Sequence, residues 1–596
     1  MNNPTTHFMK VNHKLLILSL SIGLMTALSC KKYDGDDSDD DDDETTIVDA
    51  ETGNAEDHEE ASDYVWEGDT VTAIILNETS ITVSGDGASA SGTTATVTAA
   101  GTYLVSGTLD NGKIIVDTED EDAVKLVLNA VNITCSNSAP IFVKSAEKAI
   151  VILPSGTTNY LTDGSSYSYS SSDEDEPNAA LYSKSDLSIS GEGALVVDAN
   201  YNDGITSKDG LIIASGNISV NSVDDGIRGK DYLIIESGTI NVTSGGDGFK
   251  SDNDEDDAKG YISIESGTIT ITAANDGMQA TTDLLIADGT FNLTTGGGSS
   301  KTISSSVSAK GLKSDLNIII ESGDFTINSA DDAIHSASLI TINDGTIAIS
   351  SGDDGIHTDN TVNVNGGEIT ITKSYEGIEG PYINMNGGTT YVTSSDDGLN
   401  ASKGNGGESN DGSLLSITGG YLYISSTGDG LDSNGSITST GGTVIVNGPS
   451  SSVEVGLDYN GTFSLNGGLI LIAGPNSSMT QGASSSSTQN SVLVRFSSSK
   501  SSSTLFNIQD ASGNSLVTFQ PAKTYSSVLY SSSDLTKGTT YYIYSGGSYS
   551  GGSETDGLYT GGTYSGGTQY SSFTVSGSVT SVGSSSGSSG GGGGGR

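Results

Sequence analysis

Residues 225–229 read DGIRG, and residues 247–251 read DGFKS, 22 positions further along the chain. Related phrases begin at Asp354, Asp397 and Asp429. Self-similarity at a fixed period indicates one supersecondary unit that stacks on copies of itself, because each unit is too small to bury a core alone. The sequence therefore predicts a solenoid.

Each repeat also contains short alternating runs. Leu233–Glu236 and Thr239–Val242 are separated by a Ser-Gly pair, and β-branched residues at a period of two, bounded by Gly and Ser, are typical of strands. Such strands within a period of 22 residues predict an all-β fold, a parallel β-helix with about 22 residues per coil. Leucine-rich repeats need a Leu framework that is missing here, and nonapeptide rolls need a period of about nine.

The charge balance excludes one class of partner. The chain carries 24 Lys and Arg against 75 Asp and Glu, a net charge of −51. Binding to phosphates needs clustered cations. Nucleic acid is therefore not expected as a partner.

The N-terminus has the features of an exported lipoprotein. Residues 1–30 combine a basic start, an apolar stretch and a cleavage region that ends at Cys30, so we expect a signal peptide that is removed. The region resembles a bacterial lipobox, with Cys30 as the lipidation site; an ordinary signal peptide is the alternative. The Lys-plus-acid run at Lys31–Glu44 is similar to the export tag of surface lipoproteins in the Bacteroidetes. We expect an outer-membrane lipoprotein on the cell surface, monomeric and in contact with the membrane through its lipid anchor only.

The rest of the chain divides by composition. Residues 31–69 are predicted to be an acidic tether and residues 70–476 the β-helix. A small C-terminal β module is expected at 490–576, followed by a disordered Gly/Ser tail at 577–596.

Alternation predicts which side chains leave the core. If the apolar residue after Asp-Gly points inward, the next residue points outward and the small residue after it points inward again. We call the outward positions the outer stripe. It begins basic, passes through His and ends acidic: Thr206, Arg228, Lys250, Gln279, Lys313, His335, His357, Glu379, Asn400 and Asp432.

The residue before Gly, or before Ala333 in one coil, is acidic in nine of eleven coils, and we call these residues the ladder carboxylates. They are Asp203, Asp225, Asp247, Asp276, Asp332, Asp354, Glu376, Asp397 and Asp429; Lys310 and Val455 are the exceptions. Stacked coils repeat at about 4.8 Å, where each like-charge pair costs about 0.9 kcal/mol in water and about 3.5 kcal/mol at an effective dielectric of 20. A row of hard oxygen ligands suits Ca²⁺, so the ladder carboxylates are predicted to bind calcium.

Two further interpretations of these residues stay open. Asp-Gly is also turn chemistry, in which Asp accepts from backbone amides and Gly takes a positive φ. His335 and His357, one coil apart beside Asp332 and Asp354, could instead hold a transition metal.

The phrases at 225–232, 245–253, 374–380 and 428–435 together resemble a bacterial carbohydrate-binding domain family. That family is described as cellulose- and acidic-sugar-binding right-handed parallel β-helices, and the resemblance covers about Ile74 to Val575. It implies a pectate-lyase-like fold, bound calcium and affinity for polysaccharides such as polygalacturonate.

The expected function is binding of an acidic polysaccharide, or of cellulose, through a calcium-loaded β-helix, with no catalytic residue. The expected sugar contacts are Arg228, Lys250, Lys313, His335 and His357, with Tyr391 and Tyr423 as a stacking pair. One alternative is a calcium-dependent polysaccharide lyase in which Lys250 or Lys313 is the base and Arg228 assists. Another is a structural spacer or adhesin.

Overall fold

The computed structural model describes residues 53–60, 62–171, 173–404, 409–450 and 453–585. The chain divides into two units, Met1–Asp49 and Ala50–Arg596, and every described residue lies in the second. The predicted signal peptide, Cys30 and the first part of the tether lie outside the described residues. Within the described ranges no helix has the length and apolarity needed to cross a membrane.

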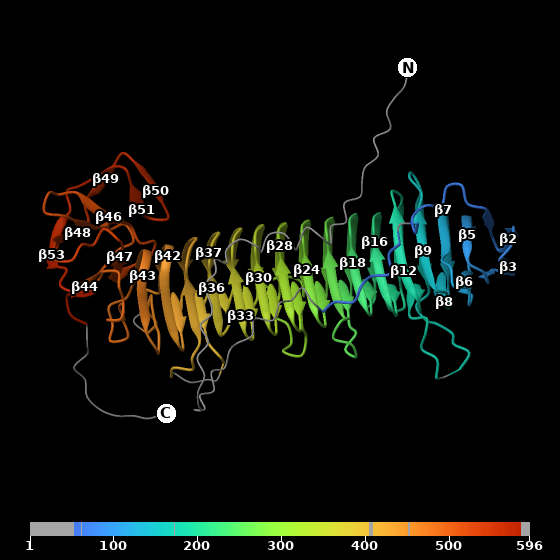
Figure 1. Cartoon of the computed structure of the whole chain (residues 1–596), viewed down its shortest axis with the longest axis horizontal. Helices are drawn as coiled ribbons and strands as arrows, with labels where there is room; N and C mark the ends of the chain where they lie inside the picture. The colour runs from blue at the N-terminus through green and yellow to red at the C-terminus, as the bar shows by residue number, and fades with distance from the viewer. Residues whose placement is uncertain (1–52, 61, 172, 405–408, 451–452, 586–596) are drawn as a thin grey trace, which may run out of the picture. The chain divides into compact units, whose positions relative to one another are not determined.

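The second unit is built around a parallel β-helix, as predicted, in which three strands of each regular coil pair with their counterparts in the next (Figure 1). In one coil these are β14 (Asp203–Ser207), β15 (Gly210–Ile213) and β16 (Asn217–Ser222); in the next they are β17 (Ile227–Gly229), β18 (Tyr232–Ile235) and β19 (Thr239–Ser244). The first strand of each coil belongs to a 15-stranded sheet that we call the ladder sheet. The other two belong to a second sheet of 31 strands.

The ladder sheet carries the Asp-Gly phrases. Its strands are β3 (Ala88–Ser91), β4 (Thr94–Val97), β6 (Lys113–Asp117), β8 (Ile141–Ser145), β11 (Ala179–Ser183), β14, β17, β20 (Phe249–Ser251), β23 (Met278–Ala280), β26 (Leu312–Ser314), β29 (Ile334–Ser336), β32 (Ile356–Thr358), β35 (Ile378–Glu379), β38 (Leu399–Ala401) and β41 (Leu431–Ser433).

The core is a stack of equivalent residues from successive coils. Ile205, Ile227, Phe249 and Met278 pair in register and are fully buried. In β17, as in most ladder strands, the middle residue is half-buried and its neighbours are buried, which confirms the predicted directions there. Thr206 of β14 is instead fully buried, so the prediction of an outward, exposed position is wrong for it. Each coil therefore depends on its neighbours for its apolar contacts, as expected of a solenoid.

The glycine of the Asp-Gly phrase allows successive coils to pack closely against each other. A Cβ on Gly226 would lie 2.3 Å from Val242 Cγ1 and 2.6 Å from the Gly248 carbonyl oxygen. Positive φ occurs instead at the corner glycines, such as Gly238 at 124°. Gly226 does not have a positive φ, so the positive-φ interpretation of Asp-Gly is wrong for it. A glycine is needed there because the backbone approaches the next coil too closely for any side chain.

Antiparallel hairpins close the N-terminal end of the β-helix. β1 (Val71–Glu78) pairs with β2 (Ser80–Ser84), and β3 pairs with β4. Such hairpins limit the unpaired strand edge that would otherwise invite association.

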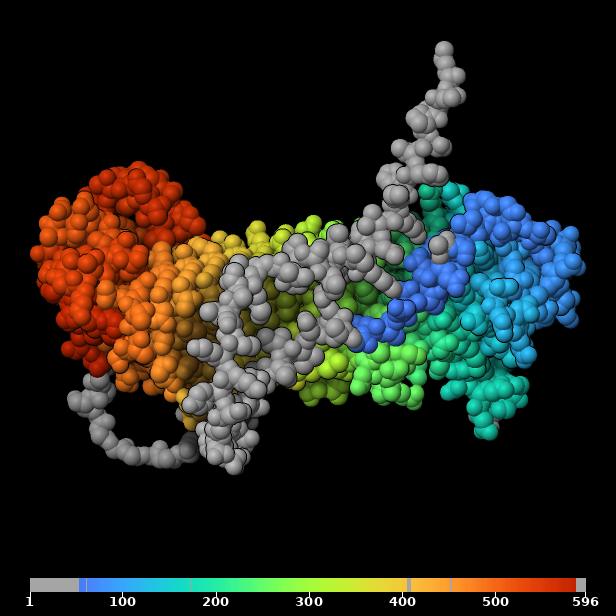
Figure 2. All heavy atoms as spheres, in the orientation of Figure 1, coloured from blue at the N-terminus to red at the C-terminus, as the bar shows by residue number. Residues whose placement is uncertain are grey.

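The segment 53–69 lies against the β-helix (Figure 2). The Ala55 amide donates to the Ala258 carbonyl at 2.7 Å, and the His58 amide donates to Tyr232 Oη at 3.0 Å. Buried Lys148 and Asp63 form an ion pair at 2.9 Å. These residues of the predicted acidic tether therefore have specific partners on the β-helix.

At the C-terminal end the module continues the second sheet. β43 (Phe463–Gly474) pairs with β47 (Tyr525–Ser531), which pairs with β44 (Ser491–Lys500). β54 (Val579–Val582) then pairs with β44, so the prediction of disorder is wrong there. The remainder of the module includes a six-stranded sheet of β45 (Phe506–Gln509), β46 (Ser515–Phe519), β48 (Thr540–Ser545), β50 (Ser553–Thr555), β51 (Leu558–Thr560) and β53 (Thr568–Thr574).

Candidate functional site

The ladder carboxylates join consecutive coils. Asp225 Oδ1 accepts the Asp247 amide proton at 2.9 Å, and Asp247 Oδ1 accepts that of Asp276 at 3.0 Å. Further along, Asp332 Oδ1 accepts from Asp354 at 3.0 Å. The turn interpretation thus holds in part: the carboxylates do accept backbone amides, but from the next coil.

Most of these carboxylates are buried. Asp203 and Asp276 are 1% exposed and Glu376 is 9% exposed. Buried carboxylates need hydrogen bonds and a compensating charge or proton. In most of these coils one carboxylate oxygen accepts a backbone amide, so the partner of the second oxygen determines how the charge is compensated.

In the first coils the protein supplies the compensating cations. Lys250 Nζ lies 3.1 Å from Asp225 Oδ2 and 2.8 Å from Asp247 Oδ2. Lys313 Nζ lies 3.2 Å from Asp276 Oδ2, and Arg228 makes a two-pronged contact with Asp252 at 3.0 and 2.7 Å. The three cations expected to contact a uronate are therefore already paired with carboxylates of the protein.

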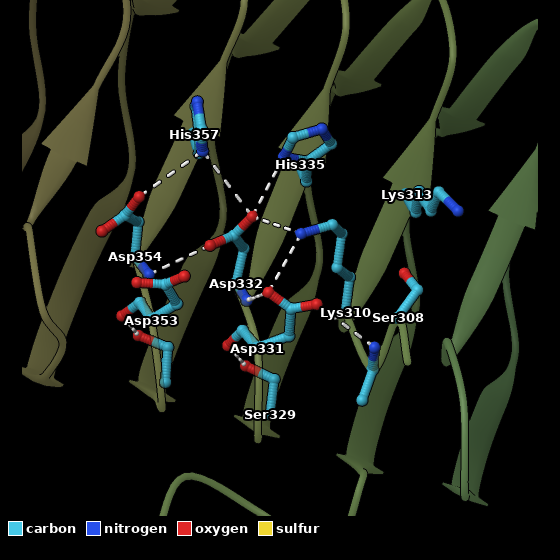
Figure 3. Close-up of polar contacts among 12 residues, drawn as sticks. Ser308, Lys310, Lys313, Ser329, Asp331, Asp332, His335, Asp353, Asp354 and His357 are labelled. Carbon is cyan, nitrogen blue, oxygen red and sulfur yellow. Dashed lines mark hydrogen bonds and ion pairs between the residues drawn. The ribbon is translucent and has the colours of Figure 1, made fainter. Parts of the chain in front are cut away.

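Midway along the ladder, the outer stripe changes from Lys313 to His335 and His357 (Figure 3). Lys310 Nζ contacts Asp332 Oδ2 at 2.5 Å and Asp331 Oδ1 at 3.1 Å. His335 Nδ1 lies 3.0 Å from the same Asp332 oxygen, and His357 Nδ1 lies 3.7 Å from it. Lys310, an exception to the acidic pattern in the sequence, thus compensates the next ladder carboxylate.

These contacts shift the pKa values of Asp332 and His357. Burial alone would raise the pKa of Asp332, but the contacts with His335, His357 and Lys310 outweigh burial and hold that pKa well below its usual range. Burial would lower the pKa of His357, but the carboxylates around it, led by Asp332, raise its pKa to about 9.

Beyond His357 the ladder and its stripe become acidic. In the part of the chain that the structure describes, no Lys or Arg forms an ion pair with Asp354, Glu376, Asp397 or Asp429. Burial, followed by neighbouring groups, raises the pKa of Asp397 to about 7, of Asp429 to about 8 and of Glu376 to about 9.

Two buried oxygens in this region lack a hydrogen-bond donor. Asn400 Nδ2 donates to Glu376 Oε1 at 3.1 Å. Glu376 Oε2 and Asn400 Oδ1 are both buried, and neither has a hydrogen-bond partner among the described residues. Nearby in the coil order, Asp429, Asp432 and Asp458 bring carboxylate oxygens within 4.8 Å of one another.

These observations test the predicted calcium row. Ca²⁺ takes six to eight oxygens at about 2.4 Å. The coils of Glu376, Asp397 and Asp429 offer carboxylates and an amide oxygen, and no Lys or Arg among the described residues forms an ion pair with these three carboxylates. Asp225, Asp247, Asp276 and Asp332 do not fit, because Lys and His side chains already contact their second oxygens. Asp203 has Asn202 and Thr206 as donors. The coils of Glu376, Asp397 and Asp429, which we call the acidic coils, are therefore the part of the predicted calcium row whose residues suit Ca²⁺.

The predicted tyrosine pair meets the C-terminal module. The Tyr391 and Tyr423 rings lie 5.8 Å apart and are tilted by 49°. Tyr391 Oη donates to Asp556 Oδ2 at 3.2 Å, and Tyr421 Oη donates to the same atom at 2.6 Å. Tyr423 packs against the core of the module. Both tyrosines therefore contact the C-terminal module, and sugar stacking by this pair stays a prediction.

The lysine environment also bears on the lyase alternative. A general base needs a pKa near the working pH. Burial would lower the pKa of Lys250, but Asp225 and Asp247 outweigh burial and raise that pKa above its ordinary value. Lys250 is therefore held protonated, which does not suit proton abstraction.

The structure also reveals a surface that the sequence reasoning missed. Outward residues of β19, β22 (Thr268–Ala273), β25 (Thr290–Thr295), β28 (Asp324–Ser329) and β31 (Thr346–Ser351) align in register. We call this surface the polar face. Its central row is Asn241, Thr270, Asn292, Thr326 and Ala348, flanked by Thr239, Thr268, Thr290, Asp324 and Thr346 on one side and by Thr243, Thr272, Thr294, Asn328 and Ser350 on the other. The Thr-Ile-Thr-Ile-Thr run at 268–272 was the signal that could have identified it.

An open groove borders the polar face. Its lining includes Asp288, Asp324, Asp344, Thr346 and Glu368, from turns and strand starts of successive coils. Asp324 and Thr346 belong to both surfaces. The groove and the polar face are therefore continuous.

The fold and these surfaces define a parallel β-helix with an extended polar surface. The profile of the family described as carbohydrate-binding domain-containing protein matches residues 91–355 and 353–568. The chain belongs to this family.

Two relatives add detail. A carbohydrate-binding domain-containing protein from Acetivibrio thermocellus is 40% identical over 156 residues, which are 26% of this chain and 54% of the relative. The chain thus spans about half the length of the curated relative that it matches. The solved structure of a polysaccharide lyase-like protein from C. thermocellum, a gadolinium derivative, shares 38% identity, covering 38% of this chain and 92% of that chain with a TM-score of 0.38.

The acidic coils predict an unusual dependence of stability on pH. Asp397, Asp429 and Glu376 have raised pKa values in the folded state, so the folded protein binds more protons than the unfolded chain between about pH 4 and pH 9. Their contribution is complete below the unfolded pKa and is lost as pH rises through the folded values. Without divalent cations, the melting temperature should fall by several degrees between about pH 6 and pH 9.

The substitution Glu376→Gln tests whether Glu376 causes this dependence of the melting temperature on pH. Glu376→Gln removes the charge, so it should raise the melting temperature at about pH 9 and leave it nearly unchanged at about pH 5. Exposed Glu119 offers a matched control, and Glu119→Gln should behave like the parent at both pH values. A parent melting temperature that stays level or rises over this range would contradict the assignment.

Proposed function

We propose that the protein binds polysaccharide without catalysis and that the polar face, with its bordering groove, is the binding surface. The observation that carries this proposal is the in-register alignment of Thr and Asn side chains over five coils. Threonine hydroxyls and asparagine amides both donate and accept hydrogen bonds, as sugar hydroxyls do. Family membership supports a carbohydrate ligand.

The geometry of the face suits a long, regular chain. Equivalent side chains recur about every 4.8 Å across the strands and about every 6.8 Å along them. They stand on a paired sheet, so little conformational entropy is lost when a ligand binds. A polymer of repeating hydroxyl groups can meet such an array at many points at once.

Charge favours an uncharged chain. The groove carries Asp288, Asp324, Asp344 and Glu368, and carboxylates accept hydrogen bonds from hydroxyl groups. The same carboxylates repel a polyuronate, and Arg228, Lys250 and Lys313 have carboxylate partners already. A neutral polysaccharide such as cellulose is therefore the proposed direct ligand, whereas polygalacturonate would need Ca²⁺ as a bridge.

Removing hydroxyl and amide groups from the central row tests this surface. The triple variant Thr270→Val, Asn292→Val and Thr326→Val keeps β-branched residues on the strands. Three hydrogen bonds at about 0.5–1.5 kcal/mol each amount to about tenfold or more in affinity. The variant should be retarded less than the parent on cellulose in affinity electrophoresis.

The matched control is Thr341→Val with Thr361→Val, on β30 (Leu339–Ile342) and β33 (Thr361–Val364) of a different column of strands. It should bind like the parent. Equal binding by the triple variant would place the sugar elsewhere. A parallel assay with polygalacturonate and Ca²⁺ that yields unsaturated product would favour the lyase, and failure to bind any polysaccharide would favour a spacer or adhesin.

We also propose that the acidic coils hold Ca²⁺. Glu376, Asn400, Asp397 and Asp429 are the residues that would supply oxygens, and Glu376 Oε2 with Asn400 Oδ1 supports this choice because neither has a donor among the described residues. Bound Ca²⁺ would supply positive charge to a region that otherwise keeps its carboxyl groups protonated.

Calcium should therefore stabilise the protein most at alkaline pH. A cation at about 100 times its dissociation constant adds about 2.7 kcal/mol to the free energy of unfolding, which corresponds to a rise of a few degrees in melting temperature. The gain should shrink in Glu376→Gln/Asp397→Asn and persist in the control Asp110→Asn/Glu119→Gln, where both residues are exposed. Equal gains in the two variants would refute this location.

We propose finally that Cys30 is acylated and that the monomeric protein is displayed on the outer membrane, with the lipid as its only membrane contact. The signal-like segment and the Lys31–Glu44 run support this address. Protease added to whole cells should degrade the parent, and Cys30→Ser should release the protein from the membrane fraction. A Cys30→Ser protein that stays in the membrane fraction would argue against the anchor.

A further inference from the structure

Two histidines from consecutive coils converge on one carboxylate oxygen. His335 Nδ1 lies 3.0 Å and His357 Nδ1 lies 3.7 Å from Asp332 Oδ2, and Figure 3 shows both rings directed toward it. One ligand atom from each of the three residues lies within 4.8 Å of the other two. The Asp332 side chain is 3% exposed, and the histidines are 19% and 28% exposed.

The β-helix fixes this geometry. His335 and His357 occupy the same outer-stripe position in β29 and β32 and pair in register. Asp332 cannot turn away freely, because its other oxygen accepts the Asp354 amide at 3.0 Å. The ligand atoms are thus held by paired backbone and by a buried hydrogen bond.

We propose that Asp332, His335 and His357 form a binding site for a transition-metal dication of the Zn²⁺ class. Two imidazole nitrogens and one carboxylate suit Zn²⁺, Ni²⁺ or Co²⁺, whereas Ca²⁺ and Mg²⁺ prefer oxygen ligands. Three protein ligands with half-exposed histidines leave a coordination position open to solvent. Asp354 Oδ2, 3.4 Å from His357 Nδ1, stands beside the site.

Lys310 competes with a metal at this site. Its Nζ lies 2.5 Å from Asp332 Oδ2, but it also contacts Asp331 Oδ1 at 3.1 Å. A bound metal would weaken the first contact and leave Lys310 paired with Asp331. Removing the lysine charge should therefore increase metal affinity, the opposite of removing a ligand.

The test uses the full mature protein with Zn²⁺ as the titrant in a calorimeter, at constant pH and in excess Ca²⁺ to saturate oxygen-only sites. The parent should bind one Zn²⁺ that Ca²⁺ does not displace, and Co²⁺ should give the absorption bands of a site with nitrogen ligands. His335→Gln/His357→Gln should lose more than the 10–100-fold in affinity that a lost ligand-supporting contact costs, and Lys310→Gln should bind Zn²⁺ more tightly than the parent.

His58→Gln is the matched control, because His58 is the third histidine of the described residues and contacts Tyr232 and Ser188 instead. It should bind Zn²⁺ like the parent. Urea unfolding without metal checks that each variant is folded. Binding that is unchanged in the double variant, fully displaced by Ca²⁺, or weakened by Lys310→Gln would overturn the proposal. None of these results depends on sugar binding.

Discussion

The hydrogen bond that most ladder carboxylates accept from a backbone amide of the next coil is the interaction on which the structure depends. It places a buried acidic group beside the same group of the next coil, as Asp225 stands beside Asp247. A buried carboxylate is tolerated only where hydrogen bonds and either a countercharge or a proton compensate it. Each such hydrogen bond therefore buries a carboxylate whose charge must be compensated by a cation or a proton.

The groups that compensate these carboxylates differ along the axis of the β-helix. Lys250 and Lys313 form ion pairs with the carboxylates of the early coils, and Lys310 with two histidines compensates Asp332. At Asp354, Glu376 and Asp429 no Lys or Arg of the described residues pairs with the carboxylate, and burial raises its pKa, which favours a bound proton in place of a protein cation. The charged side chains of the outer stripe thus mainly compensate the ladder carboxylates, which is why we propose the polar face for carbohydrate recognition.

The sequence predicted the parts of the structure that follow from periodicity. The repeat predicted the parallel β-helix, and alternation predicted that Arg228 and Lys250 point outward while Ile227 and Phe249 point inward. It could not show that Lys250 is shared by two carboxylates, because that depends on side-chain reach between coils. It also missed contacts between distant segments, such as Asp556 with Tyr391 and residues 53–69 with the β-helix, since no local pattern encodes them.

Anomalous diffraction from crystals soaked at about pH 8 in a lanthanide that replaces Ca²⁺ would show which ladder carboxylates lack a protein cation. We expect anomalous peaks beside Glu376 and Asp429, where the ladder has no lysine partner in the described chain, and no peak between Asp225 and Asp276. Peaks at every coil, with Lys250 and Lys313 displaced from their carboxylates, would contradict this expectation. So would an acidic segment without any peak at that pH.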